Sequence, residues 1–125
     1  MHGNELVLYS FPPDGQQPVR RVLSSSLIDG HALACGDLLG LGRDQIVAGW
    51  RANANKLARV GVKIWIPDEK GENWAEHLID DNEMACEDLV VADLNGDGKP
   101  EIVAAGRRTA NVKIYWNETQ KPPAQ

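Results

Sequence analysis

One segment of the sequence occurs twice, and this internal repeat restricts the folds that the chain can adopt. Residues 36–48 read GDLLGLGRDQIVA, and residues 92–104, which lie 56 positions later, read ADLNGDGKPEIVA. The segment 6–9 matches 62–65 at the same offset, and 112–115 repeats it 50 positions further on. A fixed offset shared by a loop and the next hairpin indicates a protein built from one repeated supersecondary unit.

The repeated unit reads as all-β. Alternating or short continuous apolar runs predict strands, and no segment has a sustained helical periodicity. The clearest predicted strands are 6–10, 60–66, 74–79, 89–92, 102–105 and 111–116. At most, 24–27 or 80–84 would form a single helical turn. The loop 52–59 is longer in the first copy and accounts for the change of offset, because loops absorb insertions while strands keep their register.

Counted from the N-terminus, the predicted strands fall into groups of two, four and three. We label the strands of one unit A to D, with A directly before the repeated loop, so that the chain reads C-D, A-B-C-D, A-B-C. A four-stranded repeat of about 40–60 residues is typical of a β-propeller blade. A β-sandwich would also give a continuous strand pattern, but it has no reason to repeat a loop and a hairpin at one offset. We therefore predict about two blades per chain.

Composition excludes several classes of protein. The 125 residues carry a net charge of −5, which disfavours a nucleic-acid partner because that affinity comes from Lys and Arg. No apolar run approaches the ~18–20 residues of a membrane-spanning helix, and the first residues have no signal-peptide pattern. Cys35 and Cys86 are too few for a disulfide framework, and their small apolar neighbours predict buried free thiols.

The second copy of the loop carries a pattern of oxygen donors. Asp93, Asn95, Asp97 and Glu101 occupy positions 1, 3, 5 and 9 of the loop, and Lys99 would add its backbone carbonyl. Hard oxygen donors at this spacing suit Ca²⁺, which takes six to eight such ligands. The alternatives are Mg²⁺ or an acidic turn that binds nothing. The loop is not an EF-hand, because position 12 is an alanine in a strand-like run rather than a bidentate glutamate.

The first copy of the loop has lost most of these donors. Asp37 remains, but Leu39, Leu41 and Gln45 stand where the second copy has Asn95, Asp97 and Glu101. We expect this loop to keep the turn without a metal ion. We therefore interpret the cation in the second copy as stabilising its loop locally rather than as a catalytic centre.

The segments DLNGDGKPEIVAAG and GDLLGLGRDQIVAGW resemble the FG-GAP or VCBS-type repeats of β-propellers, and the resemblance covers residues 6–116. It implies that each repeat is one four-stranded blade and that the loop between strands A and B binds Ca²⁺. Related repeat proteins are often extracellular or periplasmic, while this sequence leaves its own localisation open. The amino-acid sequence around the loop is also similar to that of bacterial VCBS-repeat proteins and of the propeller region of aldos-2-ulose dehydratase.

Charged residues at equivalent positions are candidates for chemistry. His31 and Glu87 each precede an inner strand at the repeat offset, which in a propeller places them near one mouth of the channel. They could act as general acid and base or bind a sugar, or they could be solvated rim residues. Arg51, Arg107 and Arg108 could clamp an anion, pair with the acidic loop of a neighbouring blade or be solvated.

The four tryptophans divide by their position in the repeat. Trp65 and Trp116 lie on C strands with core periodicity, so we expect them to be buried. Trp74 begins a D strand and is the better candidate for an exposed surface on which a sugar could stack.

Two blade equivalents cannot close a ring, so we expect residues 1–116 to self-associate, in about three to five copies, with strand exchange at the mismatched ends. Residues 117–125 are polar and contain proline, which predicts a disordered tail. The sequence thus favours a calcium-stabilised propeller scaffold or binding module without catalysis by the isolated chain. The alternatives are the propeller part of a sugar lyase or dehydratase, and a module that binds carbohydrate.

Overall fold

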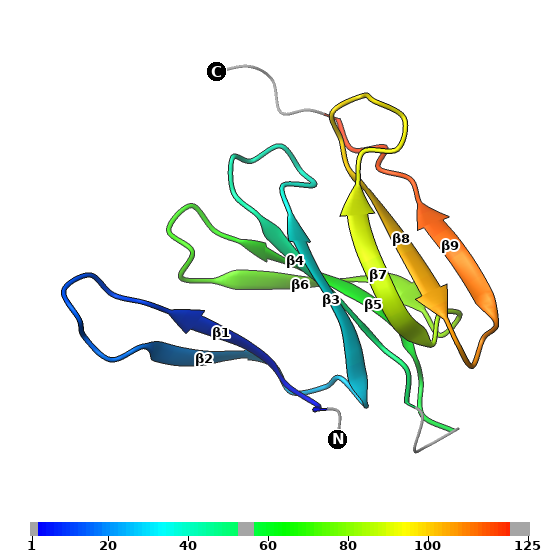
Figure 1. Cartoon of the computed structure of the whole chain (residues 1–125), viewed down its shortest axis with the longest axis horizontal. Helices are drawn as coiled ribbons and strands as arrows, with labels where there is room; N and C mark the ends of the chain where they lie inside the picture. Colours follow the sequence, from blue (N-terminus) through cyan, green and yellow to red (C-terminus); the bar gives the residue numbers. More distant parts are fainter. Residues whose placement is uncertain (1–2, 53–56, 121–125) are drawn as a thin grey trace.

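The computed structural model describes residues 3–52 and 57–120, and within them the chain forms antiparallel strands and no helix (Figure 1). The strands are β1 (Leu6–Ser10), β2 (Val19–Ser24), β3 (Gly30–Gly36), β4 (Gln45–Trp50), β5 (Gly61–Pro67), β6 (Trp74–Asp81), β7 (Cys86–Ala92), β8 (Glu101–Gly106) and β9 (Asn111–Tyr115). The described residues accordingly include no helix of the length and apolarity that a membrane span requires.

The strands form three separate sheets, ordered β1-β2, β3-β4-β5-β6 and β7-β8-β9. We call them the hairpin sheet, the central sheet and the C-terminal sheet. The grouping of two, four and three strands is the one that the repeat predicts. The helical turns considered for 24–27 and 80–84 are not formed.

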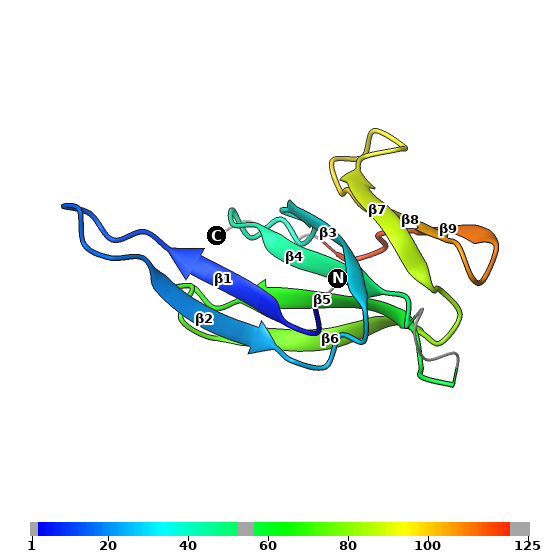
Figure 2. The ribbon, with the colours of Figure 1, turned by 60° about the horizontal axis from the view of Figure 1, so that its bottom comes forward.

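The sheets are stacked in chain order, with the hairpin sheet on one face of the central sheet and the C-terminal sheet on the other (Figures 1 and 2). β7 lies beside β3 and β4, so that the first strands of the two larger sheets are neighbours. The three sheets of the described residues do not close into a barrel or a ring.

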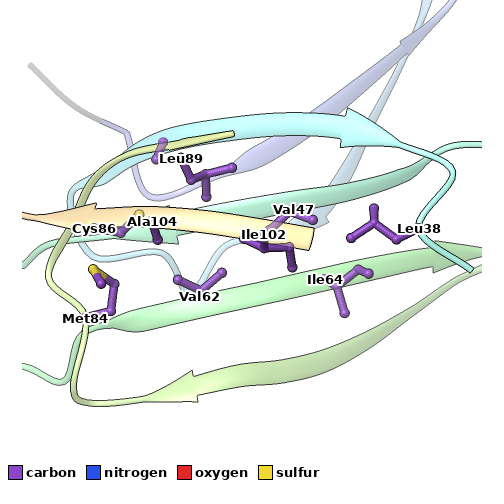
Figure 3. Packing of buried hydrophobic residues seen from close by; sticks show 10 residues of the cluster. Leu38, Val47, Val62, Ile64, Met84, Cys86, Leu89, Ile102 and Ala104 are labelled. Carbon is purple, nitrogen blue, oxygen red and sulfur yellow. The ribbon is translucent and has the colours of Figure 1, made fainter. Parts of the chain in front are cut away.

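The middle strands of the central sheet, β4 and β5, are buried on both faces. All six residues of β4 are buried, and successive side chains along a strand point to opposite sides of a sheet. Ile46 and Ala48 therefore pack toward the hairpin sheet, together with Trp65 of β5. Val47 and Val62 point the other way into the cluster shared with the C-terminal sheet (Figure 3). Burial on both faces explains why β4 is nearly continuous in apolar residues.

The two interfaces between sheets use equivalent positions of the repeat. The cluster between the hairpin and central sheets contains Leu6, Ile46, Ala48 and Trp65, and the cluster between the central and C-terminal sheets contains Val62, Ile102 and Ala104 with Tyr115 packed against it. Each residue of the second set lies 56 or 50 positions after its counterpart in the first. One sheet-to-sheet arrangement is thus used twice.

Glycine permits the close approach at the second interface. A Cβ atom added to Gly49 of β4 would collide with the side chain of Cys86, and one added to Gly36 would lie 3.0 Å from Cγ1 of Val91. Cys86 is buried, as predicted, and burial raises the pKa of its thiol to about 12. The prediction for Cys35 is wrong, because this residue is exposed on the side of β3 that faces away from the C-terminal sheet.

The expectations for the tryptophans are partly corrected. Trp65 is fully buried, whereas Trp116 is 54% exposed. Trp116 directly follows β9, which has no further strand beside it. Trp74 is half-buried against the hairpin interface and donates from Nε1 to the carbonyl of Gly71 at 3.2 Å. Trp116 is therefore the tryptophan best placed for contact with a ligand.

The beginning of the predicted tail is anchored. Nδ2 of Asn117 donates to the carbonyls of Leu38 (2.7 Å) and Pro100 (3.1 Å), and so connects the loop that follows β3 with the loop that precedes β8. The remaining part of the tail, 121–125, lies outside the described residues, as does much of the long loop 52–59.

Replacing Gly49 with alanine tests the close packing of the sheets. We expect Gly49→Ala to lower the free energy of unfolding by about 1–3 kcal/mol, because the new methyl group overlaps Cys86 in a packed core. Chemical denaturation followed by tryptophan fluorescence measures the change. Gly3→Ala is the control, since a Cβ there meets only the backbone nitrogen of Glu5 at 3.9 Å. Equal stability of Gly49→Ala and the native chain would contradict this packing.

Candidate functional site

The predicted cation-binding loop connects β7 to β8 and is organised by Asp93. Its Oδ1 accepts the N–H of Gly96 at 2.8 Å and its Oδ2 accepts the N–H of Gly98 at 2.9 Å. Both glycines have positive φ angles, 78° and 77°, which glycine adopts without the steric cost of a Cβ atom. One aspartate and two glycines therefore fold the loop back on itself.

Two further side chains of the loop make short-range contacts of the same kind. Oδ1 of Asn95 accepts the N–H of Asp97 at 3.0 Å, and Oδ1 of Asp97 accepts the N–H of Lys99 at 2.9 Å. Asparagine and aspartate favour such turns because their short side chains reach the backbone two residues on. The three predicted donors thus satisfy backbone groups of their own loop.

Glu101 closes the loop from the first position of β8. The residue is 1% exposed, and its Oε2 accepts the N–H of Leu94 at 2.8 Å. Its Oε1 is buried and has no hydrogen-bond partner among the described residues. A carboxylate oxygen in this situation carries a substantial desolvation cost unless a cation or a proton accompanies it.

The first copy of the loop has the same construction. Asp37 accepts the N–H groups of Leu41 and Gly42 at 2.8 and 2.7 Å. Oε1 of Gln45 accepts the N–H of Leu39 at 3.0 Å. Burial opposes ionisation of Asp37, but hydrogen bonds from the loop outweigh it and hold the pKa of this carboxyl below its usual value. The turn therefore forms without the oxygen donors that the second copy adds.

The difference between Gln45 and Glu101 identifies where a cation would act. Nε2 of Gln45 donates to the carbonyl of Arg43 at 2.6 Å. Residues 43 and 45 correspond to Lys99 and Glu101 at the repeat offset. In the second copy an unpartnered carboxylate oxygen replaces the amide donor. A cation bound by this oxygen and the Lys99 carbonyl would replace the N–H that the first copy supplies.

The donor set fits a hard cation, although the acidic side chains are not gathered around one centre. Among the residues that the structure describes, no three His, Cys, Asp or Glu side chains are grouped so as to hold a metal ion. Asp93 and Asp97 are instead engaged with backbone N–H groups. A shallow hollow at the loop is lined by Asn95, Asp97, Lys99, Glu101, Trp116, Asn117 and Glu118.

The second pair of sequence candidates, His31 and Glu87, meets at the interface of the central and C-terminal sheets. Nδ1 of His31 donates to the main-chain carbonyl of Glu87 at 2.5 Å, and its Nε2 lies 3.7 Å from Oε1 of the same residue. Arg51 donates to this Oε1 at 2.5 Å and to Oδ2 of Asp29 at 3.1 Å. Only 7% of Arg51 is exposed, whereas the side chains of His31 and Glu87 are 26% and 29% exposed, so in this ion cluster a buried guanidinium holds partly exposed partners.

The ion cluster is better suited to holding sheets together than to proton transfer. The hydrogen bond from Arg51 holds the pKa of Glu87 below its usual value, so the carboxylate stays ionised and paired at neutral pH. A general acid needs a pKa near the working pH. Arg51 is thus an interface residue that pairs with Glu87 of the neighbouring sheet rather than with its acidic loop, and its second partner, Asp29, was not identified from the sequence.

A third polar cluster was missed by sequence reasoning. Oδ2 of Asp80, at the end of β6, accepts hydrogen bonds from Nζ of Lys113 and the hydroxyl of Tyr115, both at 2.8 Å. The N–H of Glu83 donates to its Oδ1 at 2.9 Å. Burial opposes ionisation of Asp80, yet these bonds lower its pKa. The cluster joins the central sheet to β9.

Comparison with known proteins gives no family for this chain. No protein-family model matches it, and no significant match was found among curated proteins or solved structures. The function is therefore argued from the residues described above.

Acidification tests the ion cluster. Because the folded-state pKa of Glu87 is lowered, its stabilising contribution is complete above its unfolded pKa of about 4.5 and is lost as the pH falls through the folded value. We expect Glu87→Gln to lower the midpoint of thermal unfolding at pH 7, and the gap to the native chain to shrink below about pH 4.5.

Circular dichroism melts at pH 7, 5 and 3 measure this gap. Glu69→Gln, in the exposed turn between β5 and β6, is the control for loss of one carboxylate. A gap for Glu87→Gln that stays constant down to pH 3 would show that Glu87 acts other than through its charge.

Proposed function

We propose that this chain is a calcium-stabilised β-propeller scaffold or binding module built from FG-GAP or VCBS-type repeats. It completes its propeller by self-association, and the isolated chain performs no catalysis. The observation that carries the calcium part is the buried Oε1 of Glu101, which has no partner where the equivalent Gln45 uses an amide donor.

The propeller part is supported by the repeated packing of the sheets. The same positions bury the hairpin sheet on the central sheet and the central sheet on the C-terminal sheet. The first strands of the larger sheets, β3 and β7, are neighbours. In a propeller, each four-stranded blade is placed relative to the next in the same way around an axis, and the first strands of the blades lie closest together.

Five residues would hold the calcium ion. Asp93, Asn95, Asp97 and Glu101 offer side-chain oxygens, and Lys99 offers its carbonyl. The ion would supply positive charge at the buried carboxylate of Glu101 and next to three polar side chains of the same loop. Since the loop of the first copy folds through its own hydrogen bonds, the ion stabilises a turn that already exists.

A role in binding carbohydrate has one observation in its favour. Trp116 is 54% exposed and borders the hollow at the loop, and exposed aromatic rings stack on sugars. For the alternative of a sugar lyase or dehydratase, His31 and Glu87 do lie together, but Glu87 is paired with Arg51. The binding module is therefore the stronger alternative to a pure scaffold.

Converting the second loop to the chemistry of the first tests the calcium site. At calcium concentrations of about 10 to 100 times Kd, the native chain should gain about 1.4–2.7 kcal/mol of stability. We expect Glu101→Gln to lose this gain and, in chelator, to be at least as stable as the native chain, because its amide can donate where Gln45 does.

Thermal unfolding in calcium and in chelator measures both effects, and Asp14→Asn is the control for removal of one acidic charge. An equal calcium response in Glu101→Gln and the native chain would refute the site. A loss of stability in Glu101→Gln that is the same in both buffers would show a structural role only.

Light scattering tests self-association. We expect a discrete species of about three to five chains, against 13.7 kDa for one chain. Disassembly in chelator would place the calcium ion in the assembly. A monomer at all concentrations would refute closure of the propeller by copies of this chain.

A further inference from the structure

The two ends of the stack of sheets carry apolar faces that none of the described residues, 3–52 and 57–120, covers. The outer face of the C-terminal sheet, which we call the terminal face, consists of Val90, Val103, Ala105, Val112 and Ile114, which share one side of the register β7-β8-β9. Val90 is 52%, Val112 69% and Ile114 43% exposed. A contiguous apolar face of this kind marks an interaction site.

The same positions are buried or partly buried wherever another sheet follows, with Leu8, the counterpart of Ile64 and Ile114, only partly buried. Val112 corresponds to Val62 and to Leu6 in the repeat, and these are 0% and 7% exposed. Ile114 corresponds to Ile64, which is 5% exposed. Leu6 is covered by the central sheet, and Val62 and Ile64 by the C-terminal sheet. The terminal face is thus the third copy of one repeated surface. In the first two copies, another sheet packs on that surface.

The other end of the stack shows the complementary pattern. The outer face of the hairpin sheet, here the hairpin face, includes Val7, Tyr9 and Val22, with Arg20 opposite Tyr9 on the same side of the register β1-β2. Tyr9 is 53% and Val22 41% exposed. Tyr9 corresponds to Trp65, which is fully buried, and to Tyr115, which packs against the second core cluster. This position is buried or partly buried wherever another sheet precedes it.

We propose that the terminal face of one chain docks on the hairpin face of a second copy, head to tail. The contact continues the interface that the chain already uses twice internally, with Val112 and Ile114 in the places of Val62 and Ile64, and Tyr9 in the place of Tyr115. Because the two faces differ, the contact is heterologous and propagates into a ring or a filament. This inference rests on the proposed self-association and specifies its surfaces.

Two variants, each blocked at one end, test the arrangement. Val112→Glu disables the terminal face and Tyr9→Glu the hairpin face, and both side chains are exposed in the monomer, so neither substitution disturbs a core. Each variant alone should be monomeric in sedimentation velocity at concentrations where the native chain associates. Mixed in equal amounts, the two should form a dimer that grows no further, because each still has one intact face.

Leu78→Glu is the control, since Leu78 is 51% exposed but belongs to neither face; it should associate like the native chain. Dimerisation of Tyr9→Glu on its own would overturn the proposal in favour of contact between two terminal faces. Association of both variants like the native chain would overturn the surfaces and leave self-association intact. A monomeric native chain would overturn both, and the response to calcium, measured by thermal unfolding, would still decide the calcium site separately.

Discussion

Burial of the middle strands of the central sheet, β4 and β5, on both faces is the constraint on which the rest of the structure depends. A two-stranded hairpin such as β1-β2 is marginally stable by itself in water, and the C-terminal sheet exposes one apolar face. Both gain their core by packing on the central sheet. Gly49 sets the distance between the central and C-terminal sheets, because the absence of a side chain there lets Cys86 approach β4. The positions of His31, Glu87 and Arg51 then follow from that approach.

The repeated loops separate the folding of a turn from the binding of an ion. Asp37 and Asp93 each cap two N–H groups of their loop, and Gln45 and Glu101 each cap a third from the next strand. These contacts hold the turn in both copies. What the second copy adds is a carboxylate oxygen in a buried place, and electrostatics in a medium of low polarity makes such an oxygen a strong attractor for a cation.

The sequence predicts the features that depend on local pattern and on the period of the repeat. The alternation of apolar and polar residues and the offset of the repeat were sufficient to predict the grouping of the strands and the equivalence of Asp37 and Asp93. The prediction of exposure failed in two places: Trp116 was expected to be buried but follows β9 at the open end of the stack of sheets, and Cys35 lies on a side of β3 that stays open. The pairing of Arg51 with Glu87 could not be predicted from the sequence, because it depends on how the central and C-terminal sheets are placed.

The polar contacts at the edges of the interfaces differ, whereas the apolar ones repeat. Lys113 binds Asp80, while its counterpart Lys63 binds Ser26 at 3.2 Å, and Ser24 stands where the second interface has Asp80. Tyr115 donates to Asp80, whereas Nε1 of Trp65 has no hydrogen-bond partner among the described residues. Apolar positions that all units share allow any sheet to pack on any other. The polar positions make one order of sheets more favourable than another, because a carboxylate such as Asp80 is costly to bury against the wrong neighbour.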